Sequence, residues 1–415
     1  MKRYDTYKDS GVQWLGEIPG HWKTLLNGIL FIEDVRKPET DDIPLSLSQV
    51  DGVIPTDEMK ESSLKTSSYD NWKRVIVNDL VLNRFKAHLG VMFASNYVGM
   101  VSFHYGVFKA KMDLVPKYYE YLYHTNIYRF IYADASKGMT VGLQNLSNTS
   151  FYNVRAIYPP KDEQHSIVSF LDAKCGKIDE WVTKKQKEVE HLQELKQRVI
   201  ADAVTRGLNP HAKMKSTNIP WIKEIPEHWD MSKISSHFRQ RNEKVSDKDY
   251  PALSVSKQGV TPQLDNVALS NAEGTSRKLV KVGDYAVNSR SDRKGSCGVS
   301  KYEGSVSLIT IVLEPFNING EYVHYLFRSN PWVEEFYRNG RGIVADLWTT
   351  NYQMMKSMYM PVPPLSEQKQ IVSYLDAKTS QIDKLIAHIT KEIECIKEYK
   401  QRLISDVVTG QIKVC

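Results

Sequence analysis

The stretch Pro159-Pro160-Lys161-Asp162-Glu163-Gln164 opens the segment of the chain that decides the fold. It recurs 204 residues later as Pro363-Pro364-Leu365-Ser366-Glu367-Gln368. Between Pro159–Thr205 and Pro363–Thr409, the two copies share 24 of 47 aligned residues, and the alignment needs no gap. Self-similarity of this strength indicates that the chain contains one structural unit twice.

Both copies predict a long helix. The two prolines end the preceding element, because proline cannot sit inside a helix, and Asp162 and Ser366 follow them as N-cap residues. Gly207 and Gly410 provide the stop signals at the other end. A helix of about 44 residues is ~66 Å long.

Apolar residues in both helices fall at alternating spacings of three and four, which is the heptad pattern of a coiled coil. One polar residue in each seam, Lys196 or Lys400, can fix the register of the pairing. We expect the seam to contain Ile178, Val182, Val189, Leu192, Val199, Ile382, Ile386, Ile389, Ile393, Ile396 and Leu403.

The linker between the copies determines how the helices pair. Arg206–Pro220 has fifteen residues and spans at most ~54 Å when fully extended. A parallel partner would require it to return ~66 Å, whereas antiparallel pairing needs only a local turn. We therefore expect an antiparallel pair with one globular domain at each end and pseudo-twofold symmetry.

A second duplicated motif marks the start of each globular domain. Trp14-Leu15-Gly16-Glu17-Ile18-Pro19-Gly20-His21-Trp22 recurs as Trp221-Ile222-Lys223-Glu224-Ile225-Pro226-Glu227-His228-Trp229, and the residues that follow match only faintly. The sequence predicts an α+β fold in which two diverged α/β domains alternate with two similar helical spacers. The expected domains are 1–158 and 209–362, and the expected spacers are 159–208 and 363–415.

Strand-like and helical stretches fill both domains. Val101–Phe108 and Val306–Leu313 predict strands, and Tyr118–Tyr132 and Tyr322–Tyr337 predict one helix each. We assign four residues of the first helix to the core rather than to base stacking, namely Tyr118, Tyr119, Leu122 and Phe130.

The composition is typical of a soluble globular protein. The chain has 415 residues, of which 41% are hydrophobic and 25% are charged, so two or three domains are expected. A net charge of +6 permits nucleic-acid binding without demanding it. The four cysteines form no CxxC pair, and no apolar run is long enough to span a membrane, so we expect a cytoplasmic protein.

The sequence carries no enzymatic motif that we recognise. It has neither a P-loop nor a glycine-rich dinucleotide motif. Asp172 and Asp376 lie on the heptad helices without an evident partner carboxylate, which indicates a solvated helix face. His21 and His228 have no second ligand at helical spacing, so we expect packing or capping rather than metal binding. We therefore expect no catalytic residue, no metal and no cofactor.

Taken together, the duplicated motifs resemble the specificity subunits of type I restriction–modification systems. The resemblance rests on Trp14…Glu17-Ile18-Pro19…His21-Trp22, on the Pro-Pro-x-x-Glu-Gln helix start, and on helix ends near Val204-Thr205 and Val408-Thr409. It covers nearly the whole chain. The two copies depart from each other where Gly20 stands against Glu227 and Arg206 against Gly410.

The resemblance implies a non-catalytic subunit that binds double-stranded DNA. Each globular domain would be a target recognition domain that reads one half of a bipartite site. The helices would set the gap between the half-sites and dock two methyltransferase subunits, which would carry S-adenosylmethionine. Restriction subunits that translocate DNA would bring ATP to the full complex.

Polar and basic loops are the candidate DNA contacts, since Arg, Lys, Asn and Ser side chains reach base edges and phosphates. The first pair of equivalent loops lies at 83–90 and 288–296, and the second lies at 137–140 and 341–344. The candidate residues are Asn83, Arg84, Lys86, His88, Lys137, Thr140, Ser289, Arg290, Arg293, Lys294 and Arg341.

Two other functions stay open at this point. A coiled-coil scaffold could present two protein-binding domains without any DNA site, which the mild net charge favours and the paired basic loops disfavour. A self-contained nuclease or methyltransferase is disfavoured by the missing cofactor motifs.

Overall fold

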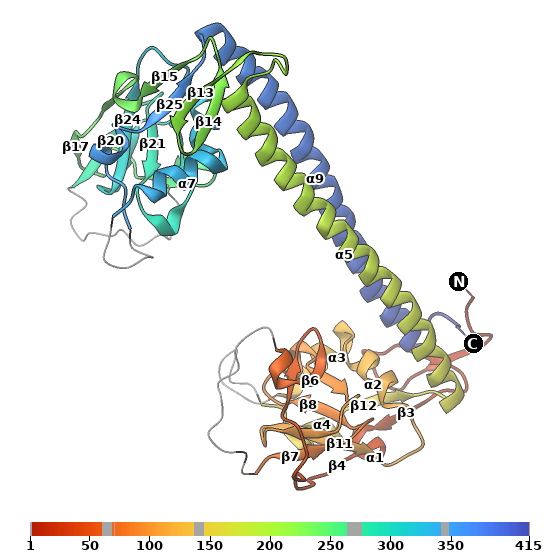
Figure 1. Ribbon diagram of the computed structural model, residues 1–415. Helices are drawn as coiled ribbons and strands as arrows, with labels where there is room; N and C mark the ends of the chain where they lie inside the picture. The colour runs from red at the N-terminus through yellow and green to blue at the C-terminus, as the bar shows by residue number, and fades with distance from the viewer. Residues whose placement is uncertain are drawn as a thin grey trace. The chain divides into compact units, whose positions relative to one another are not determined.

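The computed structural model describes residues 2–59, 69, 71–136, 145–263, 276–341 and 348–414 (Figure 1). The chain forms two compact units. Unit 1 comprises Met1–Lys185 and Lys391–Cys415, and unit 2 comprises Gln186–Thr390. The boundaries between the units fall inside the two long helices, so each helix contributes one part to each unit.

The long helices are α5 (Lys161–Arg206) and α9 (Leu365–Val408). In unit 1 the beginning of α5 packs beside the end of α9, and in unit 2 the end of α5 packs beside the beginning of α9. The two helices are therefore antiparallel within each unit, which confirms the predicted direction. Every residue of the expected seam is buried or half-buried.

Two ion pairs show the repeat symmetry of this pairing. Lys400 Nζ lies 2.6 and 2.7 Å from the carboxylate oxygens of Asp179 in unit 1. Lys196 Nζ lies 2.7 Å from both carboxylate oxygens of Asp383 in unit 2. Lys196 and Lys400 are repeat equivalents, and so are Asp179 and Asp383. The two polar seam positions thus meet acids that are repeated with them.

The elements of unit 1 precede α5. Its helices are α1 (Asn27–Leu30), α2 (Pro116–Tyr123), α3 (Asn126–Ala135) and α4 (Asn148–Tyr152). Its strands are β1 (Tyr7–Asp9), β2 (Glu17–Pro19), β3 (Lys23–Leu26), β4 (Phe31–Glu33), β5 (Leu45–Ser48), β6 (Gly52–Pro55), β7 (Lys73–Val75), β8 (Leu80–Asn83), β9 (Met92–Ala94), β10 (Gly99–Val101), β11 (Tyr105–Ala110) and β12 (Arg155–Tyr158).

The elements of unit 2 lie between α5 and α9. Its helices are α6 (Gly320–Arg328), α7 (Asn330–Arg338) and α8 (Tyr352–Met355). Its strands are β13 (Met214–Ile219), β14 (Ile222–Pro226), β15 (Asp230–Lys233), β16 (Phe238–Gln240), β17 (Lys244–Val245), β18 (Leu253–Ser256), β19 (Gly259–Pro262), β20 (Arg277–Val280), β21 (Tyr285–Asn288), β22 (Cys297–Val299), β23 (Gly304–Val306), β24 (Thr310–Pro315) and β25 (Tyr359–Val362).

A four-stranded antiparallel sheet has the same topology in both units. The strand order is β4-β11-β8-β9 in unit 1 and β16-β24-β21-β22 in unit 2. Both faces of the central strands are buried, because Leu80 and Leu82 point into a large core while Val81 joins a smaller one. Two cores therefore hold each sheet, and its loops emerge at the ends of the strands.

The larger core of each unit includes the end of a helix from the other repeat. In unit 1 it contains Leu403, Ile404, Val407 and Val408 of α9, together with Ile167 and Leu171 of α5. In unit 2 it contains Ile200, Ala203 and Val204 of α5, together with Ile371 and Leu375 of α9. The two repeats have thus exchanged the ends of their long helices.

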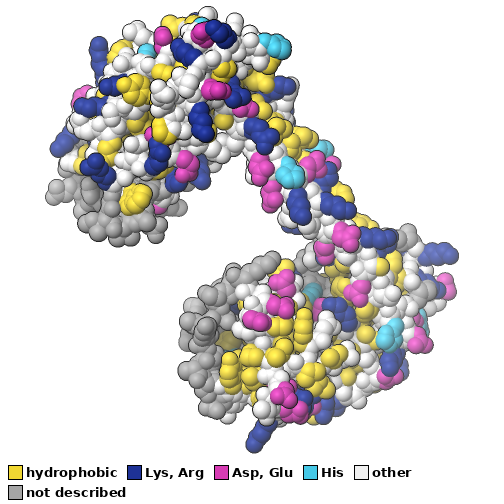
Figure 2. Space-filling view, viewed as in Figure 1, with side chains coloured by type: hydrophobic (Ala, Val, Ile, Leu, Met, Phe, Trp, Pro, Cys, Tyr) yellow, Lys and Arg dark blue, Asp and Glu magenta, His cyan; other side chains and the backbone are white. Residues whose placement is uncertain are grey.

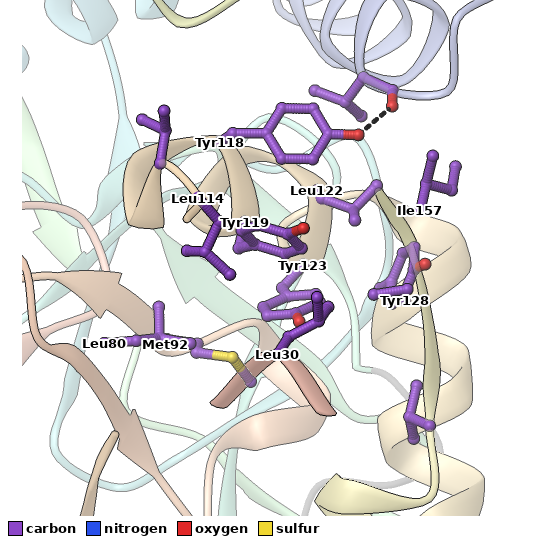
Figure 3. Packing of buried hydrophobic residues seen from close by; sticks show 14 of the residues in the cluster. Leu30, Leu80, Met92, Leu114, Tyr118, Tyr119, Leu122, Tyr123, Tyr128 and Ile157 are labelled. Atoms are coloured by element: carbon purple, nitrogen blue, oxygen red, sulfur yellow. Dashed lines mark hydrogen bonds between the residues drawn. The ribbon is translucent and has the colours of Figure 1, made fainter. Parts of the chain in front are cut away.

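Buried tyrosines hold these exchanged helix ends. Figure 3 shows the Tyr118 ring extending from α2, and its hydroxyl donates to the carbonyl of Val408 at 2.8 Å. The equivalent Tyr322 hydroxyl donates to the carbonyl of Val204 at 3.1 Å. Each bond satisfies a carbonyl of the last helical turn, which has no partner within its own helix.

Three local predictions were wrong in detail. The expected helix at Tyr118–Tyr132 is two helices, α2 and α3, because Thr125 adopts an extended backbone between them. The stretch Tyr322–Tyr337 likewise spans α6 and α7, because Ser329 adopts an extended backbone between them and Pro331 lies in the first turn of α7. Phe130 is 75% exposed, whereas Tyr118, Tyr119 and Leu122 are fully buried.

Two expected strands are also interrupted. Val101–Phe108 spans β10, a turn and β11, and Val306–Leu313 spans β23, a turn and β24. In both places a serine carbonyl accepts the amide of the residue three positions later, Ser102 from Tyr105 and Ser307 from Thr310. The apolar sequence continues through both turns, so the pattern alone does not reveal them.

The two duplicated motifs meet through one glutamate. Glu163 Oε2 accepts the indole N–H of the buried Trp22 at 3.0 Å, and Glu163 Oε1 lies 2.5 Å from His21 Nε2. In unit 2, Glu367 Oε2 accepts from Trp229 Nε1 at 3.0 Å and lies 2.8 Å from His228 Nε2. The entry motif of each domain is therefore fixed to the first turn of the helix that follows that domain.

The neighbouring glutamine fixes the same turn from another side. Gln164 accepts the amide of Val115 at 2.8 Å and donates to the carbonyl of Pro159 at 2.8 Å. Its equivalent Gln368 does the same with Asn319 and Pro363, at 2.9 and 2.8 Å. Both glutamines are buried, so these paired bonds satisfy polar groups that water does not reach.

The stop signals of the helices also contact the entry motif. Gly410 has φ +76°, and a Cβ there would lie 2.4 Å from Pro19 and 2.9 Å from Trp22. Gly207 has φ +75°, and a Cβ there would lie 3.0 Å from Trp229. Glycine is required at Gly410 both for its left-handed backbone and for the close approach to the tryptophan motif.

We predict that Glu163→Ala lowers the free energy of unfolding by about 1–3 kcal/mol, because the buried indole N–H of Trp22 loses its charged acceptor. Burial alone would raise the pKa of Glu163, but the hydrogen bonds from its partners outweigh burial and lower that pKa. This contribution is therefore present at neutral pH and is lost as the pH falls through the folded-state pKa.

Thermal or denaturant unfolding from neutral to acidic pH measures this effect. Glu180→Ala, an exposed change on the same helix, is the control and should stay near wild type. A Glu163→Ala protein as stable as the control at neutral pH would contradict the prediction, and so would a stability difference that grows in acid.

Candidate nucleic-acid interface

The first pair of candidate loops emerges from the same end of the central strands in both units. In unit 1, Asn83 at the end of β8 pairs with Tyr105 at the start of β11. In unit 2, Asn288 of β21 pairs with Thr310 of β24. Loop 84–90 therefore lies beside turn 102–105, and loop 289–296 lies beside turn 307–310. We call each loop with its turn the interface end of that unit.

Two candidate residues are buried inside these loops. Asn83 accepts the backbone amides of Phe85 and Lys86 through its side-chain oxygen, at 3.1 and 3.3 Å. Ser289 is 5% exposed, and its carbonyl accepts the amide of Thr350 at 3.0 Å. Both residues shape the backbone of a loop, and the structure does not present their side chains to solvent.

Three basic side chains of the unit 2 loop lie beside acids. Arg290 Nε is 2.9 Å from Asp292, which also lies 3.6 Å from Arg293 Nε. Lys294 Nζ is 3.0 Å from Glu334 of α7. The side chains of Arg290, Arg293 and Lys294 are 42%, 65% and 46% exposed. Exposed pairs of this kind contribute little to stability, so the cations can exchange a carboxylate for a phosphate or a base edge.

Glu33 braces the unit 1 loop. It accepts hydrogen bonds from Lys73 Nζ and Arg84 Nη2, both at 2.8 Å. Burial raises the pKa of Glu33, but bonds with Lys73 and Asn148 and the charge of Arg84 outweigh burial and lower that pKa. The ionised carboxylate holds Arg84 with only 17% of its side chain exposed. Lys86, in contrast, is exposed.

Gly90 ends the same loop beside the side chains of Arg129 and His124. Its φ is +75°, and a Cβ there would lie 2.8 Å from Arg129 Nε. His88 is half-buried, and its Nδ1 has no hydrogen-bond partner within the described part of the chain. Burial and the charges of Arg129 and Lys117 lower the pKa of the neighbouring His124 to about 4. His124 is therefore neutral at physiological pH.

The described residues that flank the second pair of loops adjoin the first pair. In unit 2, Thr349 forms isolated bridges with both Arg290 and Arg341, which brings these two candidates together. In unit 1, the amide of Leu146 donates to the carbonyl of Arg84 at 3.0 Å. Arg341 is exposed. The other two candidates of these loops, Lys137 and Thr140, lie outside the described residues.

Each interface end also displays apolar side chains that we did not predict. Phe103 in turn 102–105 is 51% exposed, and Leu308 and Ile309 in turn 307–310 are 37% and 43% exposed. The ring centroids of His104 and Phe85 lie 5.8 Å apart, so the unit 1 turn contacts the basic loop. The signal for this feature was an apolar residue directly after serine, in both Ser102-Phe103 and Ser307-Leu308.

A cleft of about 570 Å³ lies beside the unit 2 loop. Aromatic and charged side chains share its lining, which includes Trp221, Tyr337, Trp348, Lys294 and Arg338. Its charges are of both signs, since Glu334 and Glu335 also line it. Mixed charge and the open shape of the cleft do not identify a cofactor.

Features singled out for possible chemistry have structural partners. Asp172 accepts the hydroxyl of Tyr121 at 2.6 Å, and Asp376 accepts that of Tyr325 at 2.6 Å. His21 and His228 contact Glu163 and Glu367 as described above. Within the described ranges no group of three or more His, Cys, Asp or Glu residues could hold a metal ion. No described helix is both long and apolar enough to cross a membrane.

A comparison with protein families adds to this geometry. The family model of the type I restriction modification DNA specificity domain matches residues 40–191 and again residues 226–395. The chain belongs to this family. The two matches fall on the two repeats, and each includes one interface end and part of one long helix.

Other members of the type I specificity family share modest sequence identity with the chain. The putative type I restriction enzyme MjaX specificity subunit of Methanocaldococcus jannaschii is 24% identical over 324 residues, covering 73% of this chain and 70% of that protein. The EcoBI specificity subunit of Escherichia coli is 21% identical over 319 residues, covering 71% of this chain and 66% of that protein.

Solved structures share the fold at lower identity. A chain from a study of complex assembly and conformational transition of the type I R-M system has a TM-score of 0.72 at 16% identity, over 95% of this chain and 99% of that one. The HsdS subunit of Thermoanaerobacter tengcongensis has a TM-score of 0.51 at 16% identity, over 95% and 98%. These likenesses confirm the predicted fold class.

Proposed function

We propose that this chain is the DNA-specificity subunit of a type I restriction–modification complex and has no catalytic site of its own. Each unit reads one half of a bipartite site in double-stranded DNA through its interface end. The long helices set the gap between the half-sites and dock two methyltransferase subunits. Those subunits supply S-adenosylmethionine, restriction subunits supply ATP, and the complex acts in the cytoplasm.

The observation that carries the proposal is that one framework displays different side chains at the same place. The sheet order, the Glu–Trp contact and the helix ends are the same in both units. At the interface ends, however, the side chains differ. Phe103-His104 in unit 1 corresponds to Leu308-Ile309 in unit 2, and the basic loops differ in nearly every residue. Two domains that recognise different DNA sequences are expected to share a scaffold and to differ at the surface that contacts DNA.

The basic loops supply the polar part of the proposed recognition. Lys86, Arg290, Arg293, Lys294 and Arg341 are exposed or half-buried at the interface ends. Arginine can donate two bonds to the O6 and N7 atoms of guanine, and either cation can bind phosphate. The buried or braced candidates, Asn83, Arg84 and Ser289, hold the loops in position for these contacts.

We predict that replacing Arg290, Arg293 and Lys294 together with Ala weakens DNA binding by the assembled complex. If one of them contacts a base edge, its single variant should cost about 1–3 kcal/mol and relax one position of one half-site. If all three contact phosphate, the preferred sequence stays the same and the dependence of affinity on salt becomes less steep.

Binding titrations at several salt concentrations and methylation mapping measure these effects. The control replaces Lys213, Lys223 and Lys248, three exposed lysines of the same unit, with Ala and removes the same charge. An unchanged affinity and salt slope for the loop variant would contradict a DNA contact. Failure of the wild-type complex to prefer any sequence would favour the scaffold alternative.

The apolar turns supply a second means of recognition. Exposed apolar side chains beside basic loops can pack on the methyl group of thymine, which marks a T·A pair in the major groove. We predict that Phe103→Ala, or Leu308→Ala with Ile309→Ala, loses discrimination at thymine-bearing positions of one half-site. Loss of one buried methyl contact, ~0.8 kcal/mol, weakens binding about fourfold.

Uracil substitution tests this contact without changing base pairing. Once the half-sites are mapped, replacing each thymine with uracil removes only the methyl group. The wild-type complex should bind the uracil site more weakly, and the turn variant should bind both sites equally. Equal losses for the wild type and the variant would show that the turn does not touch the methyl group.

A fragment ending at Gly207 contains one complete repeat, and we predict that it forms an antiparallel homodimer. Its exposed seam needs a partner, and twofold self-pairing is the commonest closure. Asp179 of one copy can meet Lys196 of the other, because both residues lie on α5. Val204, the repeat equivalent of Val408, can accept the Tyr118 hydroxyl. The dimer should recognise an inverted repeat of one half-site.

Sedimentation of the fragment and methylation mapping with its partner measure this prediction. Asp179→Lys should weaken the dimer, and Asp179→Lys with Lys196→Asp should restore it. Lys185 stands where the other helix has Ile389, which makes this seam weaker than that of the full chain. A monomeric fragment, or a dimer that modifies the asymmetric parental site, would contradict interchangeable halves.

A further inference from the structure

Two lysines of unit 2 face each other across the strands β17 and β20. Lys244 and Lys278 are directly opposite in the antiparallel register, so their side chains lie on the same face of the sheet. Lys244 is exposed and Lys278 is half-buried. Figure 2 shows Lys and Arg side chains on the surface around the place where Figure 1 draws these two strands. We call the two residues the lysine pair.

The lysine pair lies at the interface end of unit 2. On its other side β20 pairs with β23, and Lys278 is opposite Val306, which directly precedes turn 307–310. The ammonium group of Lys278 donates to the carbonyl of Thr310 in that turn, at 2.9 Å. The lysine pair is therefore next to the turn and the basic loop that we propose to contact DNA.

The fold leaves the two charges of the lysine pair uncompensated. Like charges directly opposite each other across a sheet are destabilising. Among the described residues, no acid forms an ion pair with either lysine. Burial lowers the pKa of Lys278, because its ammonium group is partly removed from water. An anion between the two lysines would remove the repulsion and compensate the buried charge.

The equivalent lysine of unit 1 has the anion that Lys278 lacks. Lys73 stands at the same place in β7, and it donates to the carbonyl of Tyr105 at 2.8 Å. In addition, its Nζ atom lies 2.8 Å from Glu33 Oε1. The carbonyl bond is thus common to both units, whereas the ion pair is found in unit 1.

A glutamine replaces that glutamate in unit 2. Glu33 and Gln240 have the same register position on the edge strands β4 and β16. Arg84, the other cation that Glu33 binds, is replaced by Ser289. Unit 2 therefore has the half-buried lysine without the carboxylate. An ion pair within the described part of the unit does not explain why a cation is present there.

We propose that the lysine pair binds one phosphate of the DNA backbone beside the half-site that unit 2 reads. This inference rests on the proposed function and deepens it. Two ammonium groups can donate to one phosphate, and its negative charge offsets the repulsion between them. A base edge offers a neutral acceptor, which Lys278 already has in the Thr310 carbonyl. The phosphate occupies the place that the Glu33 carboxylate fills in unit 1.

Lysine substitution tests the inference in the assembled complex with the full-length chain. Lys244→Met and Lys278→Met should each weaken binding to the specific site, and the double variant should weaken it about tenfold. Because both lysines share one phosphate, the double variant should lower the slope of log affinity against log salt by about 1 and not by about 2. The preferred DNA sequence should stay the same.

A neutral linkage in the DNA identifies the phosphate. Once the half-sites are mapped, methylphosphonate can replace one phosphate at a time along the unit 2 half-site and its flanks. The wild-type complex should lose affinity at one linkage where the double lysine variant loses none, because the variant no longer contacts that phosphate.

The repeat supplies a variant that keeps both lysines. Gln240→Glu places a carboxylate where unit 1 has Glu33, so it should occupy the lysine pair and weaken DNA binding as the double lysine variant does. Ser235→Glu adds the same charge at an exposed position that precedes β16, away from the interface end, and should bind DNA like the wild type. Circular dichroism monitors folding, and Gln240→Glu keeps the test valid if loss of Lys278 unfolds unit 2.

The outcomes separate the inference from the proposed function. A wild-type complex that prefers no DNA site overturns both. An unchanged salt slope in a folded double variant overturns the inference alone, as does a methylphosphonate profile that the wild type and the variant share. A relaxed preferred sequence would indicate a base contact instead. Inorganic phosphate that raises the melting temperature of the wild type and not of the variant, without any methylphosphonate effect, would indicate a site for the free anion and also overturn the inference.

Discussion

The structure depends on a buried tryptophan that must find an acceptor for its indole N–H. Trp22 and Trp229 have no exposed surface, and each donates to a glutamate in the first turn of the helix that follows its domain. An unsatisfied donor at this depth would cost more than the bond returns. The beginning of each domain is therefore tied to its end, and both duplicated motifs are explained by one contact.

The same tryptophans also contact the helix end that comes from the other repeat. Gly410 packs against Trp22, and Gly207 packs against Trp229, so the end of each helix closes on the domain of the opposite repeat. The hydroxyls of Tyr118 and Tyr322 accompany this contact by binding the last carbonyls. Helix pairing, core completion and domain entry are one connected arrangement, and neither repeat has a complete core without the helix end that the other supplies.

Within each unit this arrangement leaves the loops at the interface end free to differ between the repeats. The loops at the interface ends are braced at their bases, by Glu33 in unit 1 and by Asn288, whose side chain accepts the amide of Arg290 at 3.2 Å, in unit 2. Their tips can change without disturbing the sheet. Different loops on a common framework agree with the proposal that the two units read different DNA sequences.

The sequence by itself determined the repeat, the two helices and their antiparallel pairing, because heptad spacing and linker length act along the chain. It also located the basic loops, since charge and glycine are local signals. Only the tertiary structure decided which loop residues are exposed and can contact a ligand. Asn83 and Arg84 look like neighbouring DNA contacts in the sequence, but burial and Glu33 draw both inward. In the sequence Leu308 and Ile309 look like part of a buried strand, but they lie in a turn that exposes them. The apolar pattern shows which residues are hydrophobic and does not show where the chain reverses direction.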